Sequence, residues 1–205
     1  MHVTRLLLFG GSFDPIHHGH LIVARAAAEH LGISRVILVP CAAPPHKPDR
    51  VLAPSVDRLA MCRVATAGEA LFEVDDFEVR AGPPCYSLRT VRHYAESQPD
   101  VAIHWLIGAD SLRELTSWHR IRELADACTF VTAARPGCAE PDWASLGAAV
   151  SPQALERIRA HVLPTPEIMI SASAIRARVR AGRSVRYLVP DGVIAYVGER
   201  GLYRG

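Results

Sequence analysis

The sequence of 205 residues has little lysine, little net charge and no cysteine motif. Lys47 is the only lysine among 23 lysines and arginines, and the net charge of +2 is too small to predict nucleic-acid binding. The five cysteines lack C-x-x-C spacing, which excludes the usual zinc and disulfide patterns and favours reduced thiols in a cytoplasmic protein. There is neither a signal-peptide pattern nor an apolar run long enough to span a bilayer, so we expect no membrane association.

Apolar strands alternate with helical segments along the chain. We expect strands at residues 3–9, 35–40, 102–107, 129–134 and 167–170, a short extended segment at 72–79, and an irregular segment at 135–151. We expect helices at residues 19–31, 55–67, 87–97, 121–127, 152–160, 173–181 and 190–200. This order predicts an α/β fold: a Rossmann-like, doubly wound parallel sheet with helices on both faces. We expect a single domain, with a core at residues 1–170 and a small helical part at 171–205.

The junction between the first strand and the first helix carries the strongest functional signal. Gly10 and Gly11 allow a ligand to approach the backbone, and the helix start favours phosphate. His17 and His20 are three residues apart, so both rings lie on one helix face. The alternative is two surface histidines beside a glycine turn, but the coincidence of glycines, proline and spaced histidines at one junction favours a phosphate site.

Residues 11–20, Gly-Ser-Phe-Asp-Pro-Ile-His-His-Gly-His, resemble the H-x-G-H signature of the nucleotidyltransferase superfamily. That superfamily includes adenylyl- and cytidylyltransferases and, more distantly, class I aminoacyl-tRNA synthetases. The resemblance implies that His17 and His20 bind the phosphates of ATP and stabilise charge at the reacting phosphorus.

Three further segments fall near the ends of expected strands. Lys47, in a Pro-Pro-His-Lys loop after the second strand, could reach the phosphates or belong to a solvated loop. Asp110 follows the third long strand and is either a ribose acceptor or a helix N-cap. Ser173, as N-cap of a late helix, and Arg176 one turn on would form a second phosphate cradle.

Two tryptophans are candidates for the site or for the core. Trp118 is either a stacking surface for a nucleotide ring or a core residue, and for Trp105 we prefer the core.

Together these segments narrow the resemblance to the bacterial nicotinate-mononucleotide adenylyltransferases, over nearly the whole chain. The resemblance implies ATP contacts at Gly10, Gly11, Ser12, Phe13, His17, His20, Gly108, Asp110, Ser173 and Arg176. It implies mononucleotide contacts at His46, Ser87, Trp118 and Arg135. Charge stabilisation would come from His17, His20, Lys47 and Arg176, with Mg²⁺ held mainly by substrate phosphates and no dedicated metal ligands.

The expected reaction joins ATP and nicotinate mononucleotide into deamido-NAD and pyrophosphate. Alternatives within the class are nicotinamide mononucleotide, pantetheine phosphate or a cytidylyl transfer. From other classes, an RNA-binding relative of the tRNA synthetases and a non-catalytic nucleotide-binding regulator remain open. The sequence does not decide between nicotinate and nicotinamide, nor whether copies of the chain form a homo-oligomer.

Overall fold

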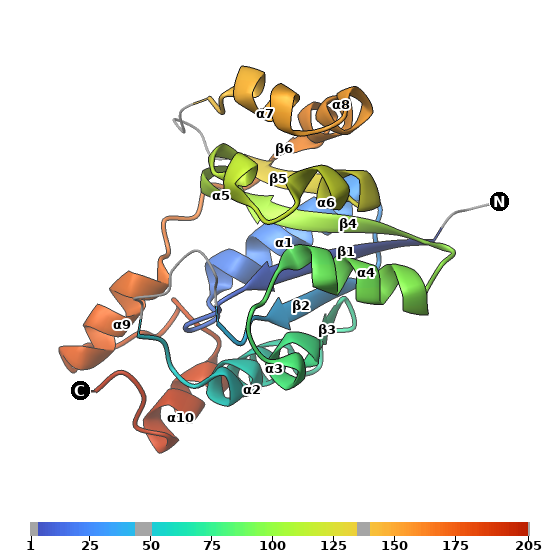
Figure 1. Ribbon diagram of the computed structural model, residues 1–205. Helices are drawn as coiled ribbons and strands as arrows, with labels where there is room; N and C mark the ends of the chain where they lie inside the picture. Colours follow the sequence, from blue (N-terminus) through green and yellow to red (C-terminus); the bar gives the residue numbers. More distant parts are fainter. Residues whose placement is uncertain (1–3, 44–50, 135–139, 205) are drawn as a thin grey trace.

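The computed structural model describes residues 4–43, 51–134 and 140–204. Its centre is a six-stranded sheet in which every neighbouring pair is parallel, in the order β3-β2-β1-β4-β5-β6 (Figure 1). The strands are β1 (Thr4–Gly11), β2 (Val36–Pro40), β3 (Phe72–Val74), β4 (Val101–Gly108), β5 (Thr129–Ala134) and β6 (Val162–Pro164). The strand order reverses between β1 and β4, and a crevice at such a reversal is where open α/β sheets bind ligands.

Helices cover both faces of the sheet, as the sequence predicted (Figure 1). They are α1 (His18–Leu31), α2 (Ser55–Thr66), α3 (Phe77–Ala81), α4 (Ser87–Ser97), α5 (Ala109–Arg113), α6 (Ile121–Ala127), α7 (Trp143–Ala149), α8 (Pro152–Ala160), α9 (Ala172–Arg180) and α10 (Asp191–Glu199). A 3-10 turn at Leu115–Ser117 lies between α5 and α6. None of these helices is long and apolar enough to cross a membrane.

The central strands are apolar on both sides because each face carries its own core. Leu6 and Leu8 of β1 pack into the cluster under α4, α6 and α8, whereas Leu7 packs into the cluster under α1, α2 and α10. Trp105 of β4 is buried, so its expected place in the core is confirmed.

The boundaries of several elements differ from expectation. Gly10 and Gly11 are the last residues of β1, not a turn after it, because they pair with Val39 and Pro40 of β2. The strand expected at 167–170 is wrong: the sixth strand is β6, which pairs with β5 in a register that joins Val162 to Thr132. Pairing with an existing strand edge, and not local hydrophobicity, decides where such a short strand forms.

Two segments expected to lack helix contain one. Residues 143–149 form α7, since the Asp142 carboxylate caps the helix by accepting from the backbone N–H groups of Ala144 and Ser145 at 3.1 and 3.0 Å. The extended segment at 72–79 ends at residue 74, and α3 begins at Phe77, whose N–H donates to the Asp75 carboxylate at 2.6 Å. Both helices begin at carboxylate hydrogen bonds that periodicity does not reveal.

The C-terminal helix α10 is fixed to α2 by a buried carboxylate. Asp57 of α2 accepts hydrogen bonds from Tyr196 Oη at 2.8 Å and from Arg200 Nε at 3.1 Å. In Figure 1, α9 and α10 lie at the end of the sheet where the carboxyl ends of the strands open. Ser171, Ala172 and Ser173, at the start of α9, border the crevice.

Candidate active site

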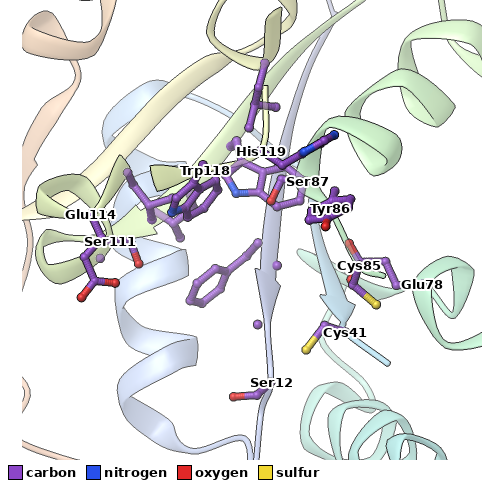
Figure 2. A pocket seen from close by; sticks show the side chains of 18 residues that line it. Ser12, Cys41, Glu78, Cys85, Tyr86, Ser87, Ser111, Glu114, Trp118 and His119 are labelled. Atoms are coloured by element: carbon purple, nitrogen blue, oxygen red, sulfur yellow. The ribbon is translucent and has the colours of Figure 1, made fainter. Parts of the chain in front are cut away.

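Two cavities adjoin each other at the carboxyl ends of β1 and β4. They share the wall formed by Gly10, Gly11, Ser12 and Gly108. The histidine cavity, of about 560 Å³, is lined further by Phe13, His17, His20, Asp110, Thr165, Ser171 and Ser173. The tryptophan cavity, of about 220 Å³ and shown in Figure 2, is lined further by Cys41, Glu78, Cys85, Tyr86, Ser87, Trp105, Ser111, Glu114, Trp118 and His119.

His17 and His20 form a reciprocal cap at the start of α1. The backbone N–H of each residue donates to Nδ1 of the other, both at 3.3 Å, and the two rings stack with centroids 3.6 Å apart. Because each Nδ1 accepts, the proton of each neutral ring sits on Nε2. The predicted juxtaposition of the histidines is confirmed, and the helix start fixes their tautomer, a feature that sequence spacing did not predict.

The glycines of this region make room for rings. A Cβ on Gly19 would stand 3.0 Å from His17 Nδ1, and one on Gly10 would stand 2.7 Å from the Trp105 ring. A Cβ on Gly11 would stand 3.0 Å from the ring of Phe13. Besides allowing a ligand to approach the backbone, Gly10 leaves the space that the Trp105 ring occupies, and Gly11 packs closely against Phe13.

Most residues expected to contact ATP meet in the histidine cavity. Of the expected set, nine line it: Gly10, Gly11, Ser12, Phe13, His17, His20, Gly108, Asp110 and Ser173. Asp110 is exposed in the first turn of α5, but Gly108 occupies the N-cap, so the capping alternative for Asp110 is wrong. The N-cap of α9 is Ser171, which accepts from Ala174 N–H at 3.2 Å, and not Ser173 as expected. Ser173 is the second residue of the helix, with its hydroxyl 3.3 Å from that of Ser171.

Arg176 lies outside the described lining and contacts the buried Asp14 of the β1–α1 loop. Its Nη1 donates to the Asp14 carbonyl oxygen at 2.6 Å and lies 3.3 Å from the Asp14 carboxylate. The same carboxylate accepts from Tyr203 Oη at 2.8 Å and from the backbone N–H of Ala53 at 3.2 Å. Asp14 thus joins the loop that carries the histidines to three distant segments of the chain.

Arg58 also positions this loop, although no sequence motif predicts that role. This fully buried guanidinium donates to the carbonyl oxygens of Ser12, Ala42 and Ala53 at 2.6, 2.9 and 2.9 Å. It therefore connects the loop after β1, the loop after β2 and the start of α2. The burial of this arginine depends on the packing of α2 against the rest of the protein, so the local sequence does not predict it.

The tryptophan cavity holds the described residues expected for the mononucleotide, Ser87 and Trp118. Trp118 is half-buried, with its ring edge-on to Phe130 at 6.0 Å between centroids, so it is both a packing residue and a wall of the cavity. Tyr86 and His119 stack on each other with centroids 4.1 Å apart. In Figure 2, Trp118, His119 and Ser87 gather at the end of the cavity opposite Ser12.

Acidic and thiol groups lie on the side of the tryptophan cavity toward α3. Burial raises the pKa of Glu78, although this carboxyl accepts from Thr90 Oγ1 at 2.5 Å. Burial also raises the pKa of the Cys41 thiol to about 11 and that of the Cys85 thiol. Cys41, Cys62, Cys85 and Cys128 are free thiols, in agreement with the expectation of reduced cysteines.

Three expected site residues, His46, Lys47 and Arg135, lie outside the described residues. Over residues 4–43, 51–134 and 140–204 there is no cluster of three or more His, Cys, Asp or Glu suited to a metal ion. Asp110 is the one carboxylate among the described residues of the histidine cavity. A metal ion in this cavity would therefore take most of its oxygen donors from a molecule bound beside it, and not from the protein.

The fold and the site define an α/β nucleotidyltransferase, with paired histidines and a helix start at the switch point of the sheet. The sequence pattern of the cytidylyltransferase-like family matches residues 8–178, most of the chain. A relative from Thermomicrobium roseum, named a probable nicotinate-nucleotide adenylyltransferase, is 42% identical over 98% of this chain and 92% of its own. A relative of the same name from Synechococcus sp. (strain JA-3-3Ab) is 37% identical over 97% and 94%.

The chain belongs to the cytidylyltransferase-like family and, within it, to the nicotinate-nucleotide adenylyltransferases. Solved structures agree with the fold. The nicotinic acid mononucleotide adenylyltransferase of Plasmodium falciparum complexed with NaAD superposes with a TM-score of 0.76 at 17% identity, covering 98% of this chain and 97% of the other.

Proposed function

We infer that this enzyme transfers the adenylyl group of ATP to nicotinate mononucleotide, giving deamido-NAD and pyrophosphate. One observation carries the assignment: two cavities of different size meet over Gly10, Gly11 and Ser12. A triphosphate against the histidines and a mononucleotide against Trp118 would bring their phosphates together at that shared wall. The near full-length identity to nicotinate-nucleotide adenylyltransferases supports the same pair of substrates.

The proposed chemistry is an in-line attack of the mononucleotide phosphate oxygen on the α-phosphorus of ATP. This nucleophile is ionised at neutral pH, so no side chain need remove a proton. The protein positions the substrates and stabilises the charge that builds on the phosphate oxygens. His17 and His20 would donate through Nε2, the ring nitrogen that the reciprocal cap protonates.

Arg176 is a further expected cation and lies outside the described lining of the histidine cavity. Arg176 is held at Asp14, in the loop that leads to the histidines, through one of its two terminal nitrogens. A guanidinium has five N–H donors, so this contact leaves capacity for a phosphate oxygen. We propose that Arg176 and Lys47 stabilise the departing pyrophosphate, with His46 and Arg135 beside the mononucleotide.

Mg²⁺ is proposed as the cofactor because the phosphates of ATP supply the hard oxygen donors that this ion prefers. The single carboxylate of the histidine cavity, Asp110, fits an ion that the substrate brings with it. Asp110 would hold the ion through its water shell. When bound, Mg²⁺ would neutralise part of the charge on the phosphate oxygens.

The test is pyrophosphate release with ATP and Mg²⁺ in separate reactions with nicotinate mononucleotide, nicotinamide mononucleotide and phosphopantetheine. We expect the fastest release with nicotinate mononucleotide. Faster release with phosphopantetheine, or none in any reaction, would overturn the proposed function.

The buried, reduced thiols support a cytoplasmic location for the enzyme, because free thiols persist in the reducing cytoplasm.

A further inference from the structure

Cys85 joins two segments that are remote along the chain. This buried residue lies directly before Tyr86 and Ser87, and all three residues line the tryptophan cavity (Figure 2). Its Sγ accepts a hydrogen bond at 3.1 Å from the backbone N–H of Ala42, which follows β2. The sulfur therefore holds the loop after β2 against the segment that precedes α4.

The same thiol is a donor to a buried carboxyl group. Glu78 of α3 accepts a hydrogen bond from the Cys85 thiol and another from Thr90 Oγ1 of α4, the latter at 2.5 Å. Burial is the main reason why the pKa of Glu78 is raised, and the hydrogen bonds from Thr90 and Cys85 offset part of that rise. Glu78 and Thr90 are both buried, so each depends on protein partners for its polar atoms.

The hydrogen bonds continue from Ala42 to the wall that the two cavities share. The carbonyl oxygen of Ala42 accepts from Arg58 Nη2 at 2.9 Å, and Arg58 Nη1 donates to the carbonyl oxygen of Ser12 at 2.6 Å. Ser12 lines both cavities. A continuous series of hydrogen bonds thus connects the wall that carries Tyr86 and Ser87 to Ser12, and a buried network whose members are satisfied makes its surroundings rigid.

We propose that Cys85 is a positioning residue for the mononucleotide, because its thiol holds Ser87 at a fixed distance from Ser12. This inference rests on the proposed function and deepens it. In that function the mononucleotide contacts Ser87, and its phosphate lies at Ser12, where it attacks ATP. A misplacement of about 1 Å can cost about 10²-fold in rate, so the separation of these two walls matters for the reaction.

The experiment measures KM for each substrate in variants of Cys85. Alanine neither donates nor accepts, so Cys85→Ala leaves the Ala42 N–H without its partner and removes one donor from Glu78. We expect KM for nicotinate mononucleotide to rise about fivefold, the scale of one lost hydrogen bond, and KM for ATP to change by less than about twofold.

Cys85→Ser separates hydrogen bonding from packing. The serine hydroxyl donates and accepts as the thiol does, so we expect KM for the mononucleotide to stay within about twofold of the wild-type value. Serine and alanine both fill less space than cysteine, and a role in packing alone therefore predicts the same rise in KM for both variants.

Cys128 provides a matched control. It is also a buried free thiol with a hydrogen bond, to the carbonyl oxygen of Leu124 at 3.3 Å, but it lines neither cavity. Cys128→Ala therefore lowers thermal stability without changing either KM. Thr90→Val is a second variant, which removes the hydroxyl that orients Glu78 and leaves Cys85 in place. It raises KM for the mononucleotide in the same direction, and it decides the question if Cys85→Ala does not fold.

The outcomes separate the two levels of inference. An unchanged KM for the mononucleotide in folded Cys85→Ala or Thr90→Val overturns the role of Cys85 and leaves the proposed function intact. Equal rises in Cys85→Ala and Cys85→Ser, or equal rises for both substrates, do the same. A wild-type enzyme that does not use nicotinate mononucleotide overturns both.

Discussion

The protonation of single ring nitrogens determines which hydrogen bonds the histidines at the start of α1 can donate. His17 and His20 each use Nδ1 to accept a backbone N–H, which places the ring protons on Nε2. The imidazoles are thus oriented before any ligand binds, and such preorganised donors lose little free energy when charge develops. The same histidines that cap the helix are therefore proposed to stabilise the reacting phosphates.

Replacing His20 with alanine removes one of these donors. We expect His20→Ala to lower kcat by about 10²-fold, the scale of losing one transition-state donor, and to reduce stability by only about 1 kcal/mol for the lost cap. Steady-state kinetics and urea unfolding measure both. His18→Ala is the control, because His18 lies in the same turn but outside the histidine cavity. Near-normal turnover in folded His20→Ala would remove His20 from the mechanism.

Trp118 has two environments, Phe130 on one side and the tryptophan cavity on the other. We expect Trp118→Ala to raise KM for the mononucleotide several-fold more than KM for ATP, since only the mononucleotide ring would lose its stacking surface. Trp143→Ala, which changes a half-buried tryptophan of α7 away from both cavities, serves as the control. Equal changes in both KM values would mean that Trp118 acts through packing alone.

At the scale of elements, α3 and α4 are joined beside the tryptophan cavity by a buried carboxyl group. Glu78 of α3 accepts from Thr90 of α4, and burial raises its pKa above the usual value near 4.3. The folded state therefore binds a proton that the unfolded state has already lost. Its contribution to stability is full at low pH and declines as pH rises from the unfolded pKa through the higher folded pKa.

Glu78→Gln removes this titration. Between pH 4 and pH 7 we expect the free energy of unfolding of the wild type to fall relative to that of Glu78→Gln, as measured by urea denaturation. Glu73→Gln should show the opposite trend, because a hydrogen bond from Arg35 lowers the pKa of Glu73, whose contribution is lost as pH falls. Identical pH dependence in wild type and Glu78→Gln would contradict the assigned shift.

At the scale of the whole molecule, the C-terminal segment supports the active site through two buried carboxylates. Asp57 holds α10 on α2, and Asp14 holds Tyr203 and Arg176 on the loop of the histidines. The two contacts are chemically alike, since each is a tyrosine hydroxyl donating to a carboxylate at 2.8 Å. Only the second involves the loop that lines the histidine cavity.

This pair gives a test that separates stability from positioning. Tyr203→Phe and Tyr196→Phe should each reduce the free energy of unfolding by about 1.5–3 kcal/mol, the range for a hydrogen bond to a charged group. Only Tyr203→Phe should also raise KM for ATP, since it removes one of the hydrogen bonds that position Asp14. Kinetics at a temperature where both variants are folded would show the difference. An equal effect on KM in both variants would mean that Asp14 has no positioning role.

The sequence by itself determined the parallel α/β architecture, the pairing of His17 and His20 and the family, because continuous apolar strands and short-range residue spacing are local signals. Tertiary structure decided what depends on distant partners. The sixth strand forms where β5 offers an edge, the N-cap of α9 is Ser171, and Arg176 meets Asp14 across 162 positions of the chain. The environments of Arg58 and His119 also depend on tertiary structure. Arg58 becomes buried, and His119 gains Tyr86 as a stacking partner, only when remote segments pack together.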